Sequence, residues 1–415
     1  MTNIATNATD KKVVLAYSGG LDTSFCVPYL LEQGYEVTTV FVDSGGITLE
    51  EKEAIEAKAY KLGAVKHIEV NITNQLWEQV IIPLIQSGQW YQNQYPLLCS
   101  DRYLIVESCL KICDQLGTKN FAHGCTGMGN DQVRFDLSVQ SLGDYNIISP
   151  IREIQKMTAH VRDYEIQFLH ERGHEVEQKV SLYSINTNLL GATISGSEID
   201  QWQQPGSESY VLTNAPENSI FKPCAITLEF NQGILTAIND QPFDNNHSVE
   251  SQIQKLNHIV GKFGVGRGIY TGDTTIGIKG RIVFEAPALH VIHLAHTALE
   301  QAVLSKSQNR FKSLIGQKWS ELVYEGLFYE PLKNDLEAFL YSSQNMVSGV
   351  VTINLTSGQA QAVSVCSENI LIDSNSVYAQ SASWNIEEAV GFIKLFGKSS
   401  VMAANRLSNS IARKP

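Results

Sequence analysis

The chain has 415 residues, too many for one ordinary domain, and 43% of them are hydrophobic, enough to bury a large core. Its formal net charge is −12, so its surface repels phosphate backbones and we expect no nucleic-acid partner. Any anionic ligand must therefore be held by a small positive site inside a negative protein.

The N-terminus and the cysteines indicate the cellular compartment. Met1–Asp10 is polar and lacks the basic-then-apolar order of a signal peptide, and no apolar run reaches the length of a membrane span. The seven cysteines include no Cys-x-x-Cys pair, so neither a disulfide framework nor a zinc site is suggested. Cys109 and Cys113, four residues apart, are expected to be small buried residues of one helix. We expect a soluble cytoplasmic protein with no membrane partner.

The first third of the chain alternates strands and helices. Apolar runs predict five strands, at residues 12–17, 36–42, 66–70, 120–123 and 146–149. Helical patterns separate the first three strands, at 25–32 and 50–62. Strands that alternate with helices predict a parallel, doubly wound sheet, in which ligands bind at the carboxyl ends of the strands.

The character of the sequence changes after about Gly173. Residues 176–240 are richer in short β-like pieces and turns, and residues 250–320 mix helical patterns with a glycine-rich stretch. Residues 384–407 are expected to form one helix. Its apolar residues pack either on a neighbouring subunit or on their own domain, and the sequence leaves both open.

The first chemical motif is Ser-Gly-Gly-Leu-Asp-Thr-Ser at residues 18–24, directly between a strand and a helix. Its two glycines allow a close backbone approach and positive φ. The next amides are the free donors of a helix N-terminus, which form an anion site, and Ser18, Thr23 and Ser24 add hydroxyls. Asp22 repels phosphate, so it either caps the helix or contacts phosphate through a magnesium ion. A plain strand–helix turn is the weaker alternative.

Two other phosphate motifs are excluded. A Walker loop would need four residues between its glycines, but the stretch from Gly391 to Ser399 has one residue too many and follows no strand. Residues 264–268 lack the third glycine of a dinucleotide-binding fingerprint. Residues 18–24 therefore carry the nucleotide-binding prediction.

A second glycine-rich segment, residues 123–134 (His-Gly-Cys-Thr-Gly-Met-Gly-Asn-Asp-Gln-Val-Arg), also follows a predicted strand and is expected at the same sheet edge. Asp131 and Arg134 share one face if a helix begins there. An Asp can hold a substrate ammonium, and an Arg can bind a carboxylate through two hydrogen bonds. The alternative is a glycine-rich loop with a structural Asp–Arg pair.

Residues 16–24 (AYSGGLDTS) and 123–134 together resemble the two signature segments of the argininosuccinate synthases. The similarity continues through residues 183–189, 285–287 and 321–324, and so covers most of the chain. In that family the ureido oxygen of citrulline attacks the α-phosphate of ATP and releases pyrophosphate. The aspartate amine then displaces AMP, which forms argininosuccinate in arginine biosynthesis.

The resemblance implies roles for the matching residues. ATP would be held by Ala16, Tyr17, Ser18, Gly19, Gly20, Leu21, Asp22, Thr23, Ser24, Val42 and Gly124. Aspartate would be bound by Thr126, Asn130 and Asp131. Citrulline would be bound by Tyr95, Ser100, Asn130, Arg134, Ser184, Thr193 and Asp273. Ser18, Asp22 and Arg134 would be the catalytic groups, acting by positioning and electrostatic stabilisation. Magnesium on the phosphates is the expected metal, and no protein metal ligand is assigned.

Several positions depart from the family pattern, mostly in the citrulline half. Leu98–Tyr103 stands where the family has Gly-Thr-Ser-Leu-Ala-Arg, so the arginine spacing is shifted, and Met128 replaces a frequent lysine. A citrulline-binding Glu falls at Gly272, beside Asp273, and a citrulline-binding Tyr falls at Phe284. Losing one such hydrogen bond costs ~1–3 kcal/mol. The departures therefore concentrate in the citrulline half, while the ATP and aspartate halves keep the family residues.

The resemblance implies an α/β fold in three parts. A doubly wound, adenine nucleotide alpha hydrolase-like ATP-pyrophosphatase domain is expected at 11–172. An α+β synthetase domain is expected at 173–380, and a C-terminal helical oligomerisation tail at 381–415. The homotetramers of the family favour assembly. Two alternatives remain: a related adenylating enzyme acting on another ureido or amide substrate or on tRNA, and a nucleotide-binding regulatory paralogue without turnover. An enzyme that acts on tRNA would need basic surface patches, which the net charge of −12 disfavours. A regulatory paralogue would not need an aspartate-binding pocket, which the polar residues 126, 130, 131 and 134 indicate.

Overall fold

The computed structural model describes residues 11–175, 183–215, 222–244, 248–378, 380 and 382–411. Met1–Asp10, where the sequence shows no signal-peptide pattern, lie outside the described residues. The chain divides into two compact units, Met1–Asn369 and Ile370–Pro415, and each is described by itself. Within the described part of the chain, no helix combines the length and the apolar character that crossing a membrane requires.

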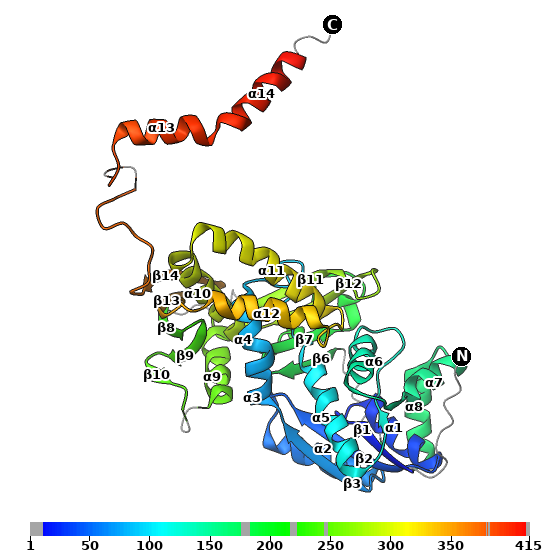
Figure 1. The fold of residues 1–415 in the computed structure, drawn as a ribbon. Coiled ribbons are helices and arrows are strands. Elements are labelled where there is room, and N and C mark those ends of the chain that lie inside the picture. Colours follow the sequence, from blue (N-terminus) through cyan, green and yellow to red (C-terminus); the bar gives the residue numbers. More distant parts are fainter. Residues whose placement is uncertain are drawn as a thin grey trace. The chain divides into compact units, whose positions relative to one another are not determined.

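Five parallel strands form the sheet that the sequence predicts for the first third of the chain (Figure 1). They are β1 (Lys12–Ala16), β2 (Glu36–Asp43), β3 (Lys66–Asn71), β4 (Asn120–Ala122) and β5 (Asn146–Ile148). Their order is β3-β2-β1-β4-β5, so the chain reverses its direction across the sheet between β1 and β4. Such a reversal opens a crevice at the carboxyl ends of the two strands, where ligands bind in sheets of this kind.

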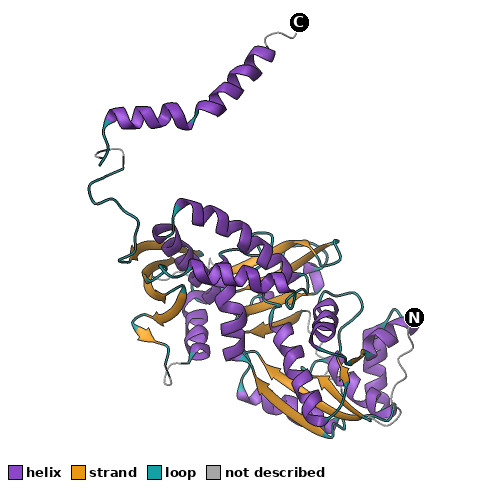
Figure 2. Ribbon diagram, viewed as in Figure 1, coloured by secondary structure: helices purple, strands orange, loops and turns teal. Residues whose placement is uncertain are grey.

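Helices cover both faces of this sheet (Figure 2). α1 (Leu21–Glu32), α7 (Pro150–Met157) and α8 (Val161–Glu171) pack together on one face, while α5 (Asp101–Leu116) packs on the other and against α6 (Asp131–Leu142). α2 (Leu49–Lys61) packs beside α1 and β3. Val13 and Leu15 of β1 join the core on the α1 side, and Val14 between them is equally buried. A strand buried on both faces explains the continuous apolar run in the sequence.

Two antiparallel sheets follow, as the α+β prediction requires. The first contains β6 (Ser184–Asn188), β7 (Gly191–Ser195), β11 (Arg267–Asp273) and β12 (Lys279–Glu285), in the order β11-β12-β7-β6. The second contains β8 (Cys224–Asn231), β9 (Ile234–Ile238), β10 (Gln241–Pro242), β13 (Gly349–Thr356) and β14 (Gln359–Cys366), in the order β10-β9-β8-β13-β14.

The remaining helices of this unit pack around these sheets. They are α3 (Thr73–Leu76), α4 (Ile82–Ser87), α9 (Val249–Gly261), α10 (Pro287–Val303), α11 (Lys306–Tyr324) and α12 (Pro331–Ser343), with a π-helical turn at Trp77–Ile81 and 3-10 turns at Ser197–Ile199 and Ser207–Ser209. α10 packs on β13, β14 and α9, and α11 packs on α4 and α12.

Hydrogen bonds attach the β6–β7 hairpin to loops beside the parallel sheet. The Leu189 amide donates to the Ser44 carbonyl just beyond β2 (2.8 Å), and the Asn188 side chain donates to the Leu98 carbonyl (2.7 Å). Gly46 lies so close to this hairpin, with φ +98°, that a Cβ there would come within 3.2 Å of Thr187. The hairpin is therefore fixed beside the carboxyl edge of the parallel sheet.

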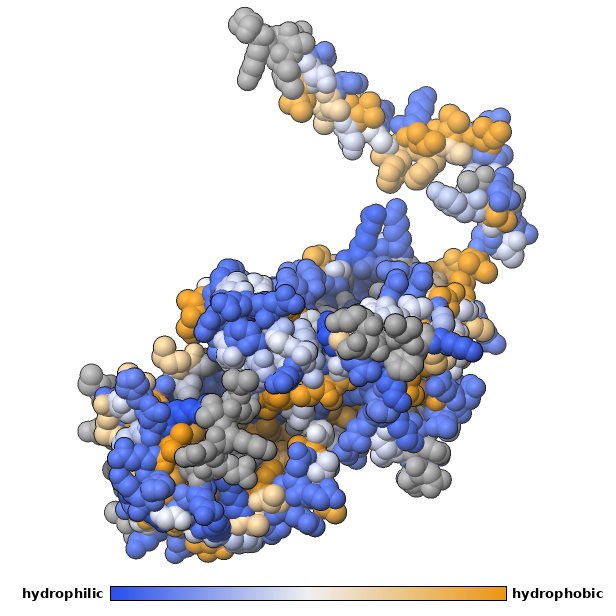
Figure 3. Space-filling view, turned by 180° about the vertical axis from the view of Figure 1, so that it is seen from behind, coloured by the Kyte–Doolittle hydropathy of each residue, from blue (hydrophilic) through white to orange (hydrophobic). Residues whose placement is uncertain are grey.

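The C-terminal unit corrects one prediction. Instead of one helix at 384–407 it contains two, α13 (Ile386–Phe396) and α14 (Lys398–Ile411), separated at Gly397. Glycine is a poor helix former, which accounts for the break at that position. α13 begins with a capping box formed by Asn385 and Glu388. Its apolar side chains are strongly exposed, including Phe392 and Phe396 at 62% and 72%, and Figure 3 shows apolar surface along these helices.

Candidate active site

The first loop, between β1 and α1, has its shape fixed by its own residues. Gly19 has φ +75°, and a Cβ there would lie 2.9 Å from the Ile55 side chain. The Gly20 amide donates to the Ser18 hydroxyl, and the Thr23 hydroxyl donates to the Gly20 carbonyl, both at 3.3 Å. The first amides of α1 lie just beyond and have no carbonyl within the helix to bond. This part of the loop has the free backbone donors that the predicted anion site requires.

Several predicted ATP residues lie around this loop. Ala16 and Tyr17 are buried, while Ser18 is exposed. Val42 is buried at the end of β2, the strand next to β1. Gly20 occupies the N-cap position and no side chain caps the helix there, so Asp22 does not have the capping role considered from the sequence.

Two residues near the first loop could not be identified from the sequence. Lys58 of α2 donates from its ammonium to the Gly19 carbonyl (2.6 Å), which places a positive charge beside the anion site. Glu165 of α8 lies within hydrogen-bonding distance of Asp22. Burial, together with the neighbouring Asp22, raises the pKa of Glu165, and burial also raises the pKa of Asp22. Both residues come from helices distant in sequence, and neither belongs to a motif.

The second loop, after β4, touches the first. A Cβ on Gly124 would lie 3.0 Å from the Thr23 methyl group and 3.3 Å from its amide. His123 is buried and holds the start of the loop by accepting from the Cys125 amide (3.1 Å), and its other ring nitrogen lies 3.1 Å from Asp136. Burial lowers the pKa of His123, although Asp136 opposes this effect. Both glycine-rich loops therefore lie at the point where the strand order reverses.

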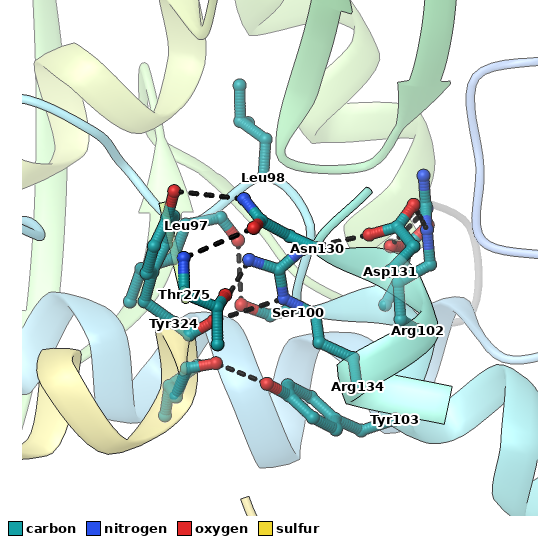
Figure 4. A network of polar contacts seen from close by, with 12 residues as sticks. Leu97, Leu98, Ser100, Arg102, Tyr103, Asn130, Asp131, Arg134, Thr275 and Tyr324 are labelled. Atoms are coloured by element: carbon teal, nitrogen blue, oxygen red, sulfur yellow. Dashed lines mark hydrogen bonds and ion pairs between the residues drawn. The ribbon is translucent and has the colours of Figure 1, made fainter. Parts of the chain in front are cut away.

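Asp131 and Arg134 share one face of α6, as their spacing predicts, and form an ion pair at 2.8 Å (Figure 4). A second arginine, Arg102, contacts the other oxygen of Asp131 at 3.1 Å and also pairs with Asp101. Burial alone would raise the pKa of Asp131, but the two guanidinium groups outweigh it and lower the pKa to about 2. The Asp131 side chain remains 40% exposed, so a ligand can still reach its carboxylate.

Arg134 is 3% exposed and its guanidinium is already engaged. Two of its nitrogens donate to the Tyr324 carbonyl, at 3.1 and 2.9 Å, in addition to the bond with Asp131. The Tyr324 hydroxyl accepts from the Asn130 side chain (3.3 Å), whose oxygen accepts from the Thr275 amide (3.1 Å). Figure 4 shows this network. Tyr324, at the end of α11, thus connects two of the predicted substrate residues.

The other predicted citrulline residues occupy different environments. Tyr95 is buried among aromatic rings, 5.4 Å from Tyr270 and 5.9 Å from Phe284 between centroids. Thr193 of β7 pairs with Phe284, and Ser195, two residues further along β7, pairs with Ser184. Residues two apart in a strand and their cross-strand partners face the same side, so Ser184, Thr193 and Phe284 share one face of their sheet. Ser100 differs because it is fully buried and its hydroxyl donates to the Leu97 carbonyl (2.7 Å).

Position 272, where the family pattern has a glutamate, has no room for a side chain. A Cβ there would overlap the side-chain oxygen of Gln92 and the hydroxyl of Tyr270. Gln92 accepts from the Tyr270 hydroxyl (3.0 Å) and donates to the Asp273 carboxylate (2.7 Å), which also pairs with Lys279. Gln92 and Tyr270 therefore fill the space next to position 272, and no sequence motif pointed to Gln92.

A cavity of about 260 Å³ opens beside this group. Its lining includes Tyr91, Gln92, Asp273, Thr275, Glu321 and Glu325. Because Thr275 is bonded to Asn130, the cavity lies next to the predicted substrate residues of the second loop. Thr126 is half-buried in that loop, and Met128 is almost fully exposed.

Comparisons with known proteins agree along nearly the whole chain. Residues 12–175 match the model of the arginosuccinate synthase N-terminal HUP domain, and residues 183–403 match that of the arginosuccinate synthase C-terminal domain. The argininosuccinate synthase of Xanthomonas axonopodis pv. citri is 52% identical over 97% of this chain and 96% of its own length. That of Xylella fastidiosa is 51% identical over 96% and 98%, and that of Pyrococcus furiosus is 39% identical over 95% of each chain.

Proposed function

The chain belongs to the argininosuccinate synthase family, and on that premise we propose that its two glycine-rich loops bring ATP, citrulline and aspartate together to form argininosuccinate. It is an ATP-dependent ligase of arginine biosynthesis. The observation that supports this assignment is the close approach of Gly124 to Thr23, because it brings the two glycine-rich loops side by side. Adjacent binding makes the reaction effectively intramolecular, which is the main source of rate when no general base is needed.

ATP binds along residues 16–24, with Val42 and Gly124 completing its site. The amides that begin α1 and the Ser18 hydroxyl face the phosphates, and Lys58 adds a cation. These donors stabilise the charge that develops when the ureido oxygen attacks the α-phosphate. They also explain how a protein with net charge −12 can bind an anionic ligand, since backbone dipoles attract phosphate without a basic surface.

Aspartate binds at Thr126, Asn130 and Asp131. The exposed carboxylate of Asp131 receives the substrate ammonium, while Arg102 and Arg134 supply positive charge for the substrate carboxylates. Since the Asp131 carboxylate is ionised at any pH well above about 2, this recognition is constant across the physiological range. Arg134 acts as the catalytic positioning group because it fixes Asp131 against the end of α11.

Citrulline binds between the second loop and the β11–β12 hairpin. Tyr95, Asn130, Arg134, Ser184 and Thr193 surround its path, and Asp273 with Gln92 takes the place of the family glutamate. The Ser100 hydroxyl is already bonded to Leu97, which supports a role in holding the loop that carries Tyr95.

A magnesium ion fits this site as a companion of the phosphates. Among the described residues, no three or more His, Cys, Asp or Glu side chains are grouped to hold a metal. Magnesium prefers one or two carboxylates plus phosphates and water, and Asp22 offers such a carboxylate next to the anion site. When bound, the ion neutralises charge on the departing pyrophosphate.

The proposal also covers the domain boundaries, the oligomeric state and the location of the protein. The bounds 11–172, 173–380 and 381–415 separate nucleotide binding, synthesis and oligomerisation. The exposed apolar residues of α13 and α14 favour a homotetramer in which this tail packs on other copies. The cytoplasm is the proposed location, because the seven cysteines are unpaired where described and ATP is the energy source.

Pyrophosphate release from ATP tests the reaction when citrulline and aspartate are added singly and together. We expect release to require citrulline, and argininosuccinate to form only when aspartate is also present. Release that depends on neither amino acid would exclude the proposed reaction. A requirement for aspartate with preference for another ureido or guanidino compound would assign an altered specificity to the pocket at Gly272.

A further inference from the structure

Glu165 is a buried acid that the proposed mechanism does not yet use. It lies on α8, which packs against α1, and it is 1% exposed. One of its carboxylate oxygens has no hydrogen-bond partner. Burying a polar group without a partner is costly, so a position of this kind requires an explanation.

The partner that Glu165 does face is another acid. Its carboxyl group lies within hydrogen-bonding distance of Asp22, the second residue of α1. The charged groups that act on this pair are Arg162, which is exposed on α8, and the two acids themselves. Cys26, one turn further along α1, completes the surroundings on the α1 side. Two carboxyl groups therefore meet next to an anion site without a basic side chain buried between them.

We propose that Glu165 and Asp22 together hold the divalent cation that accompanies the nucleotide phosphates. The inference rests on the proposed use of ATP and adds to it a second protein ligand. A hard cation such as Mg²⁺ takes oxygen ligands, and it commonly binds one or two carboxylates with phosphates and waters filling the remaining positions. The unpartnered oxygen of Glu165 supplies such a ligand, and Asp22 supplies the other.

The position of Asp22 connects this pair to the phosphates. Asp22 lies two residues after Gly20 in the loop that forms the proposed anion site, and its backbone carbonyl carbon lies 3.4 Å from where a Gly124 Cβ would be. Asp22 thus adjoins both glycine-rich loops. A cation there offsets the repulsion between two carboxylates and between Asp22 and phosphate, which amides alone do not remove.

A shared proton is the competing explanation, and one substitution separates the two. In a proton-sharing pair Glu165 is the neutral donor, so Glu165→Gln, which keeps the shape and a donor, would leave the site unchanged. In a cation site the same variant loses an anionic ligand. Asp163→Asn is the matched control, because it removes one negative charge from the same helix at an exposed position.

The experiment measures Mn²⁺ binding by electron paramagnetic resonance with the full-length protein and α,β-methylene-ATP, and nucleotide affinity by calorimetry in EDTA. We expect Glu165→Gln to weaken Mn²⁺ binding in the ternary complex at least about tenfold, because even indirect partners of metal ligands change affinity by that factor. Nucleotide affinity in EDTA should stay at the wild-type value, which also shows that the variant is folded. Asp163→Asn should match the wild type in both measurements.

Two results would overturn the proposal. One is Mn²⁺ binding by Glu165→Gln that equals the wild type, and this would favour the shared proton. The other is equally weak Mn²⁺ binding by Glu165→Asp and Glu165→Gln, since the aspartate variant retains the anionic ligand and should bind more tightly. Wild-type protein that binds no nucleotide in either condition would instead refute the proposed function, and the cation site with it.

Discussion

The two halves of the site are held together by contacts of different range. In the nucleotide half, Ser18, Gly20 and Thr23 bond to one another within a few residues of chain. In the ureido half, Gln92 bonds to Tyr270 and Asp273, which lie 178 and 181 residues further along the chain. Substitutions in the first loop should therefore affect nucleotide binding directly, whereas substitutions in the ureido half should act through their distant partners.

The largest effect is expected at Asp131, which pairs with two arginines in the second loop's part of the site. Asp131→Ala removes the carboxylate that Arg102 and Arg134 share, and we expect kcat/KM for aspartate to fall about 100-fold or more, since loss of one member of such a charged pair costs about 2–5 kcal/mol. Nucleotide affinity measured by calorimetry should be nearly unchanged. Asp144→Ala, at an exposed position after α6, is the control. Equal losses for aspartate and ATP would contradict the division of roles.

A substitution at Gly19 should separate nucleotide binding from stability. Gly19→Ala must adopt positive φ and place its methyl group 2.9 Å from Ile55, so we expect about tenfold weaker nucleotide binding, equivalent to 1.4 kcal/mol of strain in the binding loop. Gly34→Ala shares the positive φ (+86°) but meets nothing within 4 Å. Both variants should melt at lower temperature, and only the first should lose nucleotide affinity. An equal loss in both would point to general destabilisation.

In the ureido half, Gln92→Ala should raise KM for citrulline about fivefold without changing KM for ATP. The variant loses a hydrogen bond to Asp273 and one from Tyr270, and a net contribution of about 1 kcal/mol corresponds to that factor. Gln94→Ala removes the same type of side chain from the same turn. The Gln94 side chain makes only a long contact with the Thr271 amide (3.5 Å), so this variant should behave as the wild type. A KM for citrulline unchanged in Gln92→Ala would exclude Gln92 from the pocket.

The smallest effect is expected at Tyr324, which contacts Asn130 and Arg134 of the second loop. Tyr324→Phe removes only the hydroxyl that bonds Asn130, a long contact at 3.3 Å, while the carbonyl that receives Arg134 remains. We expect about threefold higher KM for aspartate, because such a bond contributes roughly 0.5–1 kcal/mol. Tyr341→Phe, on an exposed side chain of α12, provides the comparison. If the free energy of unfolding falls by more than the free energy that corresponds to the change in KM, the hydroxyl stabilises the fold instead.

Much of the nucleotide-binding domain could be predicted from the sequence, because its signals are local. The ends of the five strands were predicted to within one residue, since each is a short apolar run between polar turns. The burial of Cys109 and Cys113 followed from helical spacing. The break at Gly397 was missed because the apolar pattern of the tail continues across it, although glycine itself was the available signal.

The missed site residues have a common physical cause. Lys58, Gln92 and Glu165 reach the site from segments that carry no motif, and their direction depends on how α2, the loop after α4 and α8 pack. The sequence identified the departure at Gly272, but it could not show that Gln92 and Tyr270 fill the space. The shifted arginine, Arg102, was noted as a spacing change, and only the fold brings it to Asp131.

The internal bonding of the first loop has a consequence for affinity. Since Ser18, Gly20 and Thr23 already hold one another in place, an incoming phosphate meets a backbone whose conformation is set in advance. Little chain entropy is then lost on binding, and more of the electrostatic attraction remains as net affinity. A negatively charged protein can thus retain a polyanion with few cationic side chains, because rigidity supplies part of what charge would otherwise have to provide.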